Sequence, residues 1–530
     1  MVDPYEAGVA AGWKIVDASR LERDLTIEAD VAIVGSGAGG ATAAEILANA
    51  GLNVVLVEEG PLKSSRDFRM LESDAYPQLY QESAARKTDD KSINILQGRC
   101  VGGGTTVNWT SSFRTPAATL AFWQRSYGLD DLSVESMQPW FEMMETRLSI
   151  APWEVAPNPN NEALARGARR IGIEAAVIRR NVKGCWNLGY CGMGCPTNAK
   201  QSMLVTTVPG ALSKGATLVT RARADRYAGT GDRITELAAH AMNAEGTATT
   251  SRRIVVRARA FVTAAGAIGS PALLLRSGVP DPHAILGRRT FLHPSVISAA
   301  MMPDTIDGFA GAPQSIYSDH YLETHPIDGP IGYKLEAPPL HPILTATTLP
   351  ADGAQHARWM QEFRRMHVVI ALLRDGFNTA SEGGVVRLRD DGTPVLDYAL
   401  GPYVWEGVRR AFHSMAEIQF AAGAKQVMPI HADGQAFATY NAAKAAIDAF
   451  DLRPLATRVV SAHVMGGAPI GSDPRRAVVD LTGRHHQLAN LYVIDGSLFP
   501  TSIGANPQLS IYGLSARLAT GLAGRLAPRA

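Results

Sequence analysis

Cysteine is scarce in this sequence. Only four of its 530 residues are cysteines, and three of them lie in one short segment. So few cysteines in so long a chain do not form the disulfide framework of a small secreted protein. Residues 1–30 lack the basic start and apolar run of a secretory signal, and apolar runs such as 368–373 are far shorter than the ~18 residues of a membrane span. The sequence therefore predicts a cytoplasmic protein without a transmembrane segment.

An excess of charge of either sign is also lacking. Lysine and arginine number 51, aspartate and glutamate number 50, and the net charge is +1 at pH 7. Because proteins that bind nucleic acid carry a basic surface, this balance predicts no nucleic-acid partner. Hydrophobic residues make up 46% of the chain. A single core stops growing at about 250–300 residues, so more than one lobe is expected.

What is present begins with a nucleotide-binding pattern. Residues 30–58 show the order strand, glycine-rich turn, helix, strand and acid, with Gly35, Gly37 and Gly40 in the turn and Glu58 as the acid. The first glycine permits the tight turn, the second lets the backbone approach a pyrophosphate, and the third lets helix and strand pack closely. The acid can accept hydrogen bonds from a ribose. The pattern predicts dinucleotide binding but does not by itself separate NAD from FAD.

A second glycine-rich segment favours FAD. It runs from Gly98 and Arg99 through Gly102, Gly103 and Gly104 to Asn108. Consecutive glycines allow the backbone to approach a flat or anionic ligand closely. An NAD-binding domain has no need of such a loop at this place. A flavin has both a pyrophosphate and a ring to be held, so the loop indicates a resident flavin.

These motifs resemble the glucose–methanol–choline (GMC) oxidoreductase family. Residues 266–279 look like the family's second signature, and 463–522 look like its catalytic segment, in which 490–497 and 503–507 resemble cholesterol oxidase. The motifs follow one another in family order along nearly the whole chain. The resemblance implies an α/β and α+β fold, with a Rossmann-like FAD-binding lobe and a substrate-binding lobe built on an antiparallel sheet.

The resemblance also implies how an alcohol is oxidised. His463 corresponds to the general base that takes the hydroxyl proton, and Asn506 to the residue that hydrogen-bonds the substrate oxygen, while the hydride passes to flavin N5. Asn506-Pro507 also suits the N-cap and first position of a final helix, whose positive end would face the reduced flavin. The implied cofactor contacts are Gly35, Gly37, Gly40, Glu58, Arg99, Gly102, Gly103, Asn108, Ala224, Asp495, Gly496 and Gln508.

Several functions stay open within this reading. Similarity to fatty alcohol oxidases and cholesterol oxidase favours an apolar or long-chain alcohol, oxidised to an aldehyde or ketone, with oxygen, a quinone or a carrier protein as electron acceptor. A lyase that resembles the hydroxynitrile lyases of this family, or a sugar or polyol dehydrogenase, is an alternative. An NAD-dependent dehydrogenase is disfavoured, because the second glycine-rich loop would have no role.

The clustered cysteines have the spacing C-x5-C-x3-C and a following proline, at Cys185, Cys191 and Cys195. Soft thiolates in such a loop can hold an iron–sulfur cluster. The pattern resembles flavin-dependent sugar dehydrogenases of the family, in which it binds a [3Fe-4S] cluster. The segment with the following Lys200-Gln201 also resembles fatty alcohol oxidases. A reduced structural loop and a redox disulfide remain alternatives.

The FAD-binding lobe is expected to be assembled from separated segments. These are residues 1–114, 205–292 and 456–530. An insertion, 115–204, carries the cysteines and covers substrate and flavin, and 293–455 form the substrate lobe. Within that lobe, strands are predicted at 364–375 and 385–398 and a helix at 404–423, whereas 303–350 are rich in proline and glycine and predict an irregular loop.

We predict that the FAD is bound without a covalent link. Some family members attach the flavin to a histidine of the second glycine-rich loop, and the matching position here is Val107, which cannot form that bond. Acid precipitation should therefore release all yellow flavin into the supernatant. Flavin that stays with the precipitated protein would contradict this prediction.

Overall fold

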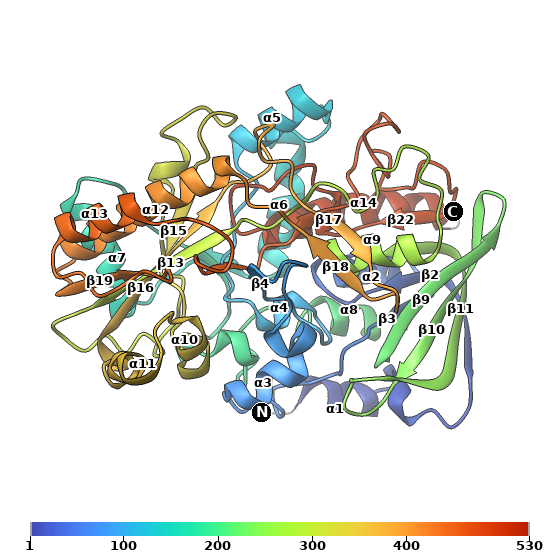
Figure 1. Ribbon diagram of the computed structural model, residues 1–530. Coiled ribbons are helices and arrows are strands. Elements are labelled where there is room, and N and C mark those ends of the chain that lie inside the picture. Colours follow the sequence, from blue (N-terminus) through green and yellow to red (C-terminus); the bar gives the residue numbers. More distant parts are fainter. Residues whose placement is uncertain (1–2, 528–530) are drawn as a thin grey trace.

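Two eight-stranded sheets organise the chain, one in each of two lobes (Figure 1). The computed structural model describes residues 3–527. The lobe on the right of Figure 1 carries the nucleotide-binding motif, and the lobe on the left is built mainly from the middle of the chain. This is the predicted combination of a Rossmann-like lobe with a second lobe on an antiparallel sheet. None of the helices within 3–527 combines the length and apolarity needed to cross a membrane.

The sheet of the first lobe has the order β1-β8-β3-β2-β11-β10-β9, with β22 paired to β11. Its strands are parallel from β1 to β11, and β10 and β9 are added antiparallel. β3 is buried at every position, as expected of a parallel strand covered on both faces. In sheet order the bounds are β1 Lys14–Asp17, β8 Thr217–Thr220, β3 Val54–Val57, β2 Leu25–Val34, β11 Thr249–Thr263, β10 Arg233–Met242, β9 Ala222–Thr230 and β22 Leu491–Val493.

The end of the chain completes this lobe. β22 adds to β11 in parallel, and α14 (Gln508–Leu526) packs on α2 (Ala38–Asn49) and α6 (Val134–Arg147). α8 (Thr207–Ser213) packs on the other side of α2, and α9 (Gly266–Arg276) lies against β9. Segments from both ends of the sequence thus surround the first glycine-rich turn.

The sheet of the second lobe has the order β4-β20-β13-β16-β15-β14-β6, with β19 paired to β13. All pairs are antiparallel except β20 with β4. α12 (Pro402–Ala421) packs on β13 and β16 and is flanked by α7 (Pro159–Arg170) and α13 (Tyr440–Ala449). In sheet order the bounds are β4 Ile93–Ile95, β20 Val459–Ser461, β13 Ser295–Met301, β16 Met366–Leu373, β15 Tyr333–Glu336, β14 Ile316–Ser318, β6 Ala176–Val177 and β19 Gln426–Pro429.

The predicted irregular loop at 303–350 is wrong in part. It contains β14, β15 and the short helix α10 (Pro342–Thr348). Strands of three and four residues are too short to show a period among prolines and glycines, and sheet pairing on both sides stabilises them. The segment 385–398 forms a hairpin of two strands, β17 (Val385–Leu388) and β18 (Pro394–Asp397).

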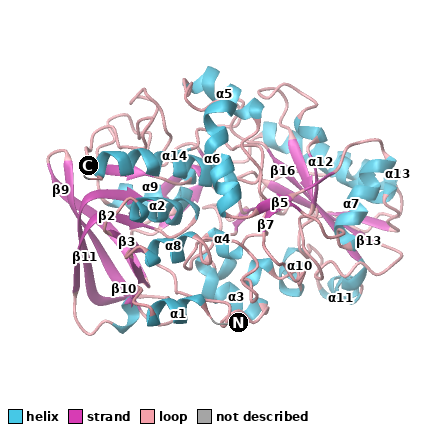
Figure 2. Ribbon diagram, turned by 180° about the vertical axis from the view of Figure 1, so that it is seen from behind, coloured by secondary structure: helices cyan, strands magenta, loops and turns pink. Residues whose placement is uncertain are grey.

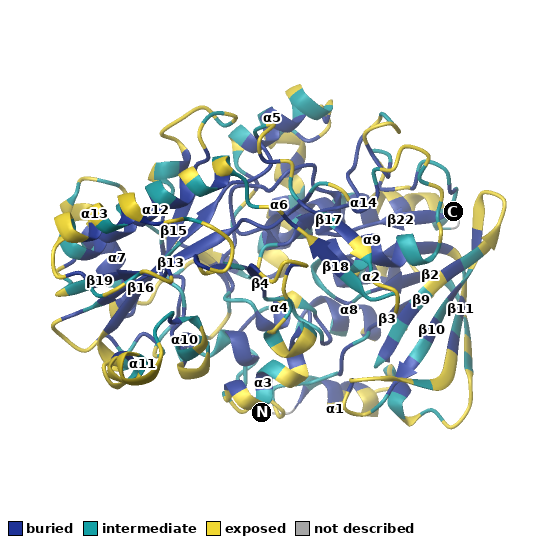
Figure 3. Cartoon of the chain, viewed as in Figure 1, coloured by how far each residue is buried: buried dark blue, intermediate teal, exposed yellow. Residues whose placement is uncertain are grey.

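The remaining elements lie outside the two sheets or connect them (Figure 2). Burial is densest in the sheets, whereas α11 and α13 expose most of their outer residues (Figure 3). These elements are α1 Pro4–Ala10, α3 Glu72–Leu79, α4 Gly104–Val107, α5 Ala117–Tyr127, α11 Gly353–Gln361 and the strand pairs β5 Ile150–Pro152 with β7 Arg179–Asn181 and β12 Thr290–Phe291 with β21 Met465–Gly466. The boundaries of the five predicted segments stay a prediction.

We predict that Gly39→Ala destabilises the protein. A Cβ at Gly39 would lie 2.0 Å from the carbonyl oxygen of Ile494, so α2 and the end of β22 would have to separate. Overpacking of this kind costs about 1–3 kcal/mol. The matched control is Gly524→Ala at an exposed position near the end of α14, where a Cβ meets nothing within 4 Å and alanine should stabilise by about 0.5–1 kcal/mol. The melting temperature should fall for Gly39→Ala and should not fall for Gly524→Ala.

Candidate functional site

A cavity of about 1400 Å³ is lined by residues of both lobes. Most of the predicted site residues line it, although they come from three distant parts of the sequence. Of the predicted catalytic and flavin-binding residues, two do not line it, namely Gly40 and Gly102. The predicted residues that line the cavity are Gly35, Gly37, Glu58, Arg99, Gly103, Asn108, Ala224, His463, Asp495, Gly496, Asn506 and Gln508.

The two glycine-rich segments touch each other through bare backbone. A Cβ at Gly103, where φ is +53°, would lie 2.9 Å from the Cα of Gly37. The backbone N–H of Gly102 donates to Ser36 Oγ at 3.0 Å. A Cβ at Gly40 would lie 2.0 Å from the carbonyl oxygen of Gly35. Gly102 therefore ties the second segment to the first, Gly40 allows close packing within the first segment, and Gly37 and Gly103 face the cavity.

Three helices begin at this cavity without a side-chain cap. α2, α9 and α14 follow Gly37, Ala265 and Pro507, which all line the cavity, and none of these three residues caps its helix with its side chain. In α9, the first N–H donates instead to the carboxylate of Asp495. The first N–H groups of a helix have no partner within it, and the helix dipole places positive charge there. Such ends bind phosphate and other anions. The residues present therefore fit the pyrophosphate and ring of FAD.

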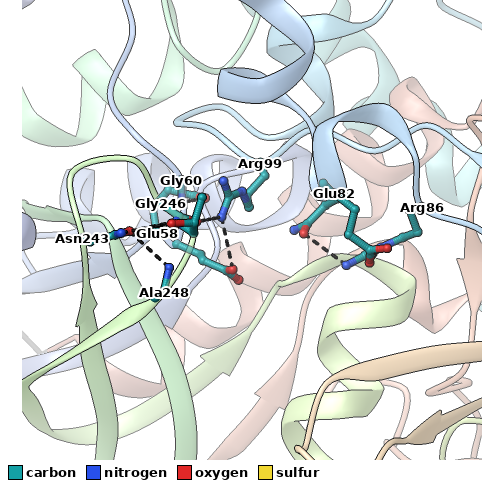
Figure 4. A network of polar contacts seen from close by, with 11 residues as sticks. Glu58, Gly60, Glu82, Arg86, Arg99, Asn243, Gly246 and Ala248 are labelled. Atoms are coloured by element: carbon teal, nitrogen blue, oxygen red, sulfur yellow. Dashed lines mark hydrogen bonds and ion pairs between the residues drawn. The ribbon is translucent and has the colours of Figure 1, made fainter.

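Glu58 lies at the nucleotide end of the cavity (Figure 4). Its Oε2 accepts hydrogen bonds from Ser36 N at 3.0 Å and Ser36 Oγ at 2.7 Å, and its Oε1 accepts one from Gly60 N at 2.9 Å. Burial raises the pKa of this carboxyl, and the hydrogen bonds from Gly60 and Ser36 oppose that rise. The carboxylate is thus fixed in place, and its remaining acceptor capacity is available to a ribose.

Arg99 and Ala224 line the same end of the cavity. The guanidinium of Arg99 donates to the carbonyl oxygen of Gly246 at 2.5 Å and lies 3.7 Å from Glu59, while its Nε has no partner among the described residues (Figure 4). The carbonyl oxygen of Ala224 accepts from Arg276 at 3.1 Å. Glu58, Arg99 and Ala224 thus line one cavity, and their role toward the cofactor stays a prediction.

Asp495 connects the second signature to the catalytic segment. Its Oδ2 accepts from Gly266 N at 2.8 Å and Ser270 Oγ at 2.5 Å, and its Oδ1 accepts from Ser497 N at 2.8 Å and Ser497 Oγ at 2.5 Å. Burial raises the pKa of the Asp495 carboxyl, and these hydrogen bonds oppose the rise. The carboxylate holds α9 and the segment of Gly496 against each other beside the flavin position.

At the other end of the cavity, Gln508 ties the second glycine-rich segment to α14. Its Oε1 accepts from Asn108 Nδ2 at 2.7 Å, and its Nε2 donates to Ser111 O at 2.8 Å and Asn181 Oδ1 at 3.1 Å. The start of α14, the loop and the insertion thus meet at one residue.

His463 lines the cavity beside a second histidine that sequence reasoning missed. Its Nδ1 lies 3.4 Å from Nδ1 of His293, whose Nε2 accepts from Gly504 N at 3.0 Å. Burial, and then the charge of Lys334, lowers the pKa of His463 to about 4. Burial also lowers the pKa of His293 well below its ordinary value. Both rings are therefore neutral at pH 7. His293 is one of 13 histidines and lies in no motif that would single it out.

Asn506 lines the cavity but does not cap the final helix as predicted. α14 begins one residue later than expected, at Gln508, with Pro507 at the cap position. Asn506 Nδ2 instead donates to Glu336 Oε2 at 3.3 Å, and the same carboxylate accepts from Gln314 Nε2. Asn506 Oδ1 is buried without a partner among the described residues. Glu336 and Gln314 were missed because they fall in the segment predicted to be irregular.

The [3Fe-4S] prediction is not supported. Between residues 3 and 527, no three side chains of the metal-binding kinds are grouped so that they could hold an ion. Each thiol instead has its own partner: Cys185 accepts from Asn187 N at 3.4 Å, Cys191 from Arg180 at 3.8 Å and Cys195 from Lys200 N at 3.5 Å. All three cysteines are free and lie outside the cavity lining.

Comparison with family models decides the relationship. The GMC oxidoreductase models match residues 76–295 and 380–515, and an FAD binding domain model matches 30–68. The chain belongs to the GMC oxidoreductase family. It is therefore an FAD-dependent oxidoreductase, as predicted. A relative from Mycobacterium tuberculosis, named uncharacterized GMC-type oxidoreductase MT0511/MT0512, is 30% identical over 98% of this chain and 81% of its own length.

Further relatives are named by their substrates. Long-chain-alcohol oxidase FAO1 of Arabidopsis thaliana is 27% identical over 94% of this chain and 68% of its own length. Among solved structures, pyridoxine 4-oxidase from Mesorbium loti superposes with a TM-score of 0.69 at 18% identity, over 93% of this chain and 98% of its own. Formate oxidase of Aspergillus oryzae superposes with a TM-score of 0.71 at 16% identity, over 94% of this chain and 99% of its own. At these identities, the structures establish the fold.

We predict that Glu58→Gln weakens FAD binding by about tenfold or more, because a hydrogen bond to a charged group contributes about 1.5–3 kcal/mol. An amide N–H of glutamine would face either the Ser36 or the Gly60 donor. Titration of the apoprotein with FAD, followed by fluorescence quenching, measures the change. The matched control is Glu59→Gln, the neighbouring lining residue whose carboxylate has only the 3.7 Å contact with Arg99. Equal affinity losses in both variants would contradict the assigned role of Glu58.

Proposed function

We propose that this chain oxidises an alcohol with an apolar carbon chain and passes the electrons to oxygen. The observation that carries the proposal is an aliphatic region of the cavity near His463 and Asn506. Met366, Val368, Ile370 and Leu372 alternate along β16 and all line it. Because side chains alternate between the faces of a strand, one face of β16 is an apolar wall.

Neighbouring elements complete this apolar region. Ile297 of β13 lines it beside β16, and Leu344 of α10 lines it as well. α10 is tied to the other lobe by Glu72 of α3, whose carboxylate accepts from Ile343 N at 2.7 Å and Leu344 N at 2.8 Å. A hydrocarbon chain would remove these aliphatic surfaces from water, whereas a sugar would leave its hydroxyl groups without partners.

The polar residues of the cavity suit the hydroxyl group. FAD, when bound, supplies the acceptor of the hydride. Neutral His463 accepts the hydroxyl proton directly. Asn506, whose buried Oδ1 has no partner among the described residues, lines the same cavity and can orient the alcohol as it docks. Glu336 binds Asn506 Nδ2 and so fixes which side of the amide is presented. The names of the long-chain-alcohol oxidases, which match 94% of this chain in the case of FAO1, support both the substrate class and oxygen as acceptor.

The test of this function is anaerobic reduction of the flavin by primary alcohols of increasing length. Each methylene that becomes buried contributes about 0.8 kcal/mol, or about a fourfold rise in kcat/KM, until the region is filled. Oxygen consumption by the reduced enzyme then tests the acceptor. Reduction by sugars or polyols in preference to long alcohols would overturn the substrate class. A flavin that no alcohol bleaches would favour the lyase.

We predict that His463→Ala retains FAD but reduces it at least 100-fold more slowly, the usual contribution of a positioned base. In the parent enzyme the rate should be level near neutral pH and fall as the pH drops through about 4, because protonated His463 cannot accept a proton. Stopped-flow absorbance of the flavin measures both. The control is His367→Gln, since His367 is a buried histidine on the opposite face of β16, where it bonds Asn160. Near-normal reduction in His463→Ala would remove His463 from the mechanism.

A further inference from the structure

Two buried cations lie beside the cavity without a carboxylate partner. Arg180 is 0% exposed and Lys200 is 2% exposed, and neither forms an ion pair with an acid among residues 3–527. Lys334, which is equally buried, pairs with Asp319 at 2.8 Å. Burying a charge without a counter-charge is costly, so buried cations are normally paired. Their partners are neutral: Arg180 lies 5.0 Å over the Trp153 ring, and Lys200 Nζ donates to the carbonyl oxygen of Cys191 at 2.8 Å. No carboxylate balances either cation within the described residues.

Both side chains bond the segment 106–110. Lys200 Nζ donates to the carbonyl oxygens of Thr106 at 2.6 Å and Asn108 at 2.9 Å. Arg180 donates to Thr110 Oγ1 at 2.7 Å and to the carbonyl oxygen of Trp109 at 3.2 Å. Residues 107–110 of this segment line the cavity. The two charges therefore lie behind the part of the cavity wall that this segment forms.

This part of the cavity is where the redox-active ring belongs. Asn108 bonds Gln508 at the start of α14, next to Asn506. The ring has to lie near His463 and Asn506 if it is to receive hydride from a substrate held there. The nucleotide end, marked by Glu58 and Ala224, is formed by other residues of the cavity. Arg180 and Lys200 therefore lie near the ring and not near the adenine.

We propose that Lys200 and Arg180 stabilise the reduced flavin, because their positive charges lie behind residues 106–110 and face the negative charge that the ring gains on reduction. The ring accepts a hydride, that is, two electrons and one proton, and ends with one added negative charge. Two cations in a medium of low dielectric constant attract that charge more strongly than in water. The proposal depends on FAD in this cavity and not on which alcohol reduces it.

The surroundings of Lys200 support a charge that is present at neutral pH. Burial lowers its pKa to about 8, and the charges of nearby cysteines oppose that effect. An anionic ring would raise it again. Cys195 is the competing counter-charge: burial would raise the pKa of its thiol, but hydrogen bonds from Thr197 and from the backbone of Lys200 lower it. A Cys195 thiolate that already neutralised Lys200 would leave the flavin unaffected by this lysine.

The test compares Lys200→Met with Lys200→Arg in the FAD-loaded protein. Chemical reduction against reference dyes gives the midpoint potential, and titration with sulfite, which adds to flavin as an anion, gives a second equilibrium. The methionine variant should bind sulfite at least tenfold more weakly. Its midpoint potential should be lower by about 30 mV, which corresponds to a tenfold change in the equilibrium constant of a two-electron reduction. The arginine variant, which keeps the charge, should stay within about threefold of the parent. Neither measurement uses an alcohol, so failure of the proposed substrate class would not affect the outcome.

Controls separate charge from loss of structure. Lys183→Met removes the same charge from an exposed position of the same insertion and should change neither equilibrium. Arg180→Met is the second variant, for use if Lys200→Met does not retain oxidised FAD. Equal effects in Lys200→Met and Lys200→Arg, or unchanged equilibria in Lys200→Met, would overturn the proposal. Loss of oxidised FAD from both methionine variants would also overturn it, because the two residues would then be structural.

Discussion

Close contact between three stretches of bare backbone is the constraint on which the site depends. Gly37 meets Gly103, and Gly39 meets the carbonyl oxygen of Ile494. Any side chain at these contacts would push the segments apart, since protein interiors are already packed to the density of organic crystals. The three uncapped helix ends, Glu58 and Asp495 take their places only because these segments meet. The cofactor site is therefore a product of tertiary packing as much as of any single motif.

The balance of charge differs along the cavity. At the nucleotide end, the carboxylate of Glu58 is fixed by N–H and O–H donors. At the flavin end, two buried cations and the start of α14 provide positive potential, whereas His463 and His293 are kept neutral. A neutral base beside a positive wall suits a reaction in which a proton leaves the substrate and negative charge arrives at the ring. The aliphatic face of β16 lines the same cavity.

Much of this arrangement could be predicted from sequence because the relevant features are local. The turn at Gly35 lies between a strand and a helix whose apolar patterns are strong, and the family motifs extended the prediction to His463 and Asn506. What could not be predicted depends on partners distant in sequence. β15 exists because β14 and β16 pair with it, and it places Glu336 against Asn506. Likewise, no local signal indicates that His293 faces His463, or that Asn506 prefers Glu336 to capping α14.

The position of β22 and α14 affects how the chain reaches its native state during synthesis. The sheet of the first lobe incorporates β2 and β22, which are separated by most of the sequence. A ribosome must therefore release the chain at least through β22 before this sheet is complete, although its first strands emerge much earlier. Until then, the faces of α2 that α14 will cover remain open to solvent and to other chains, a period of exposure in which nascent proteins aggregate or recruit chaperones. A site built on β22 and α14 is complete only after both elements have been synthesised.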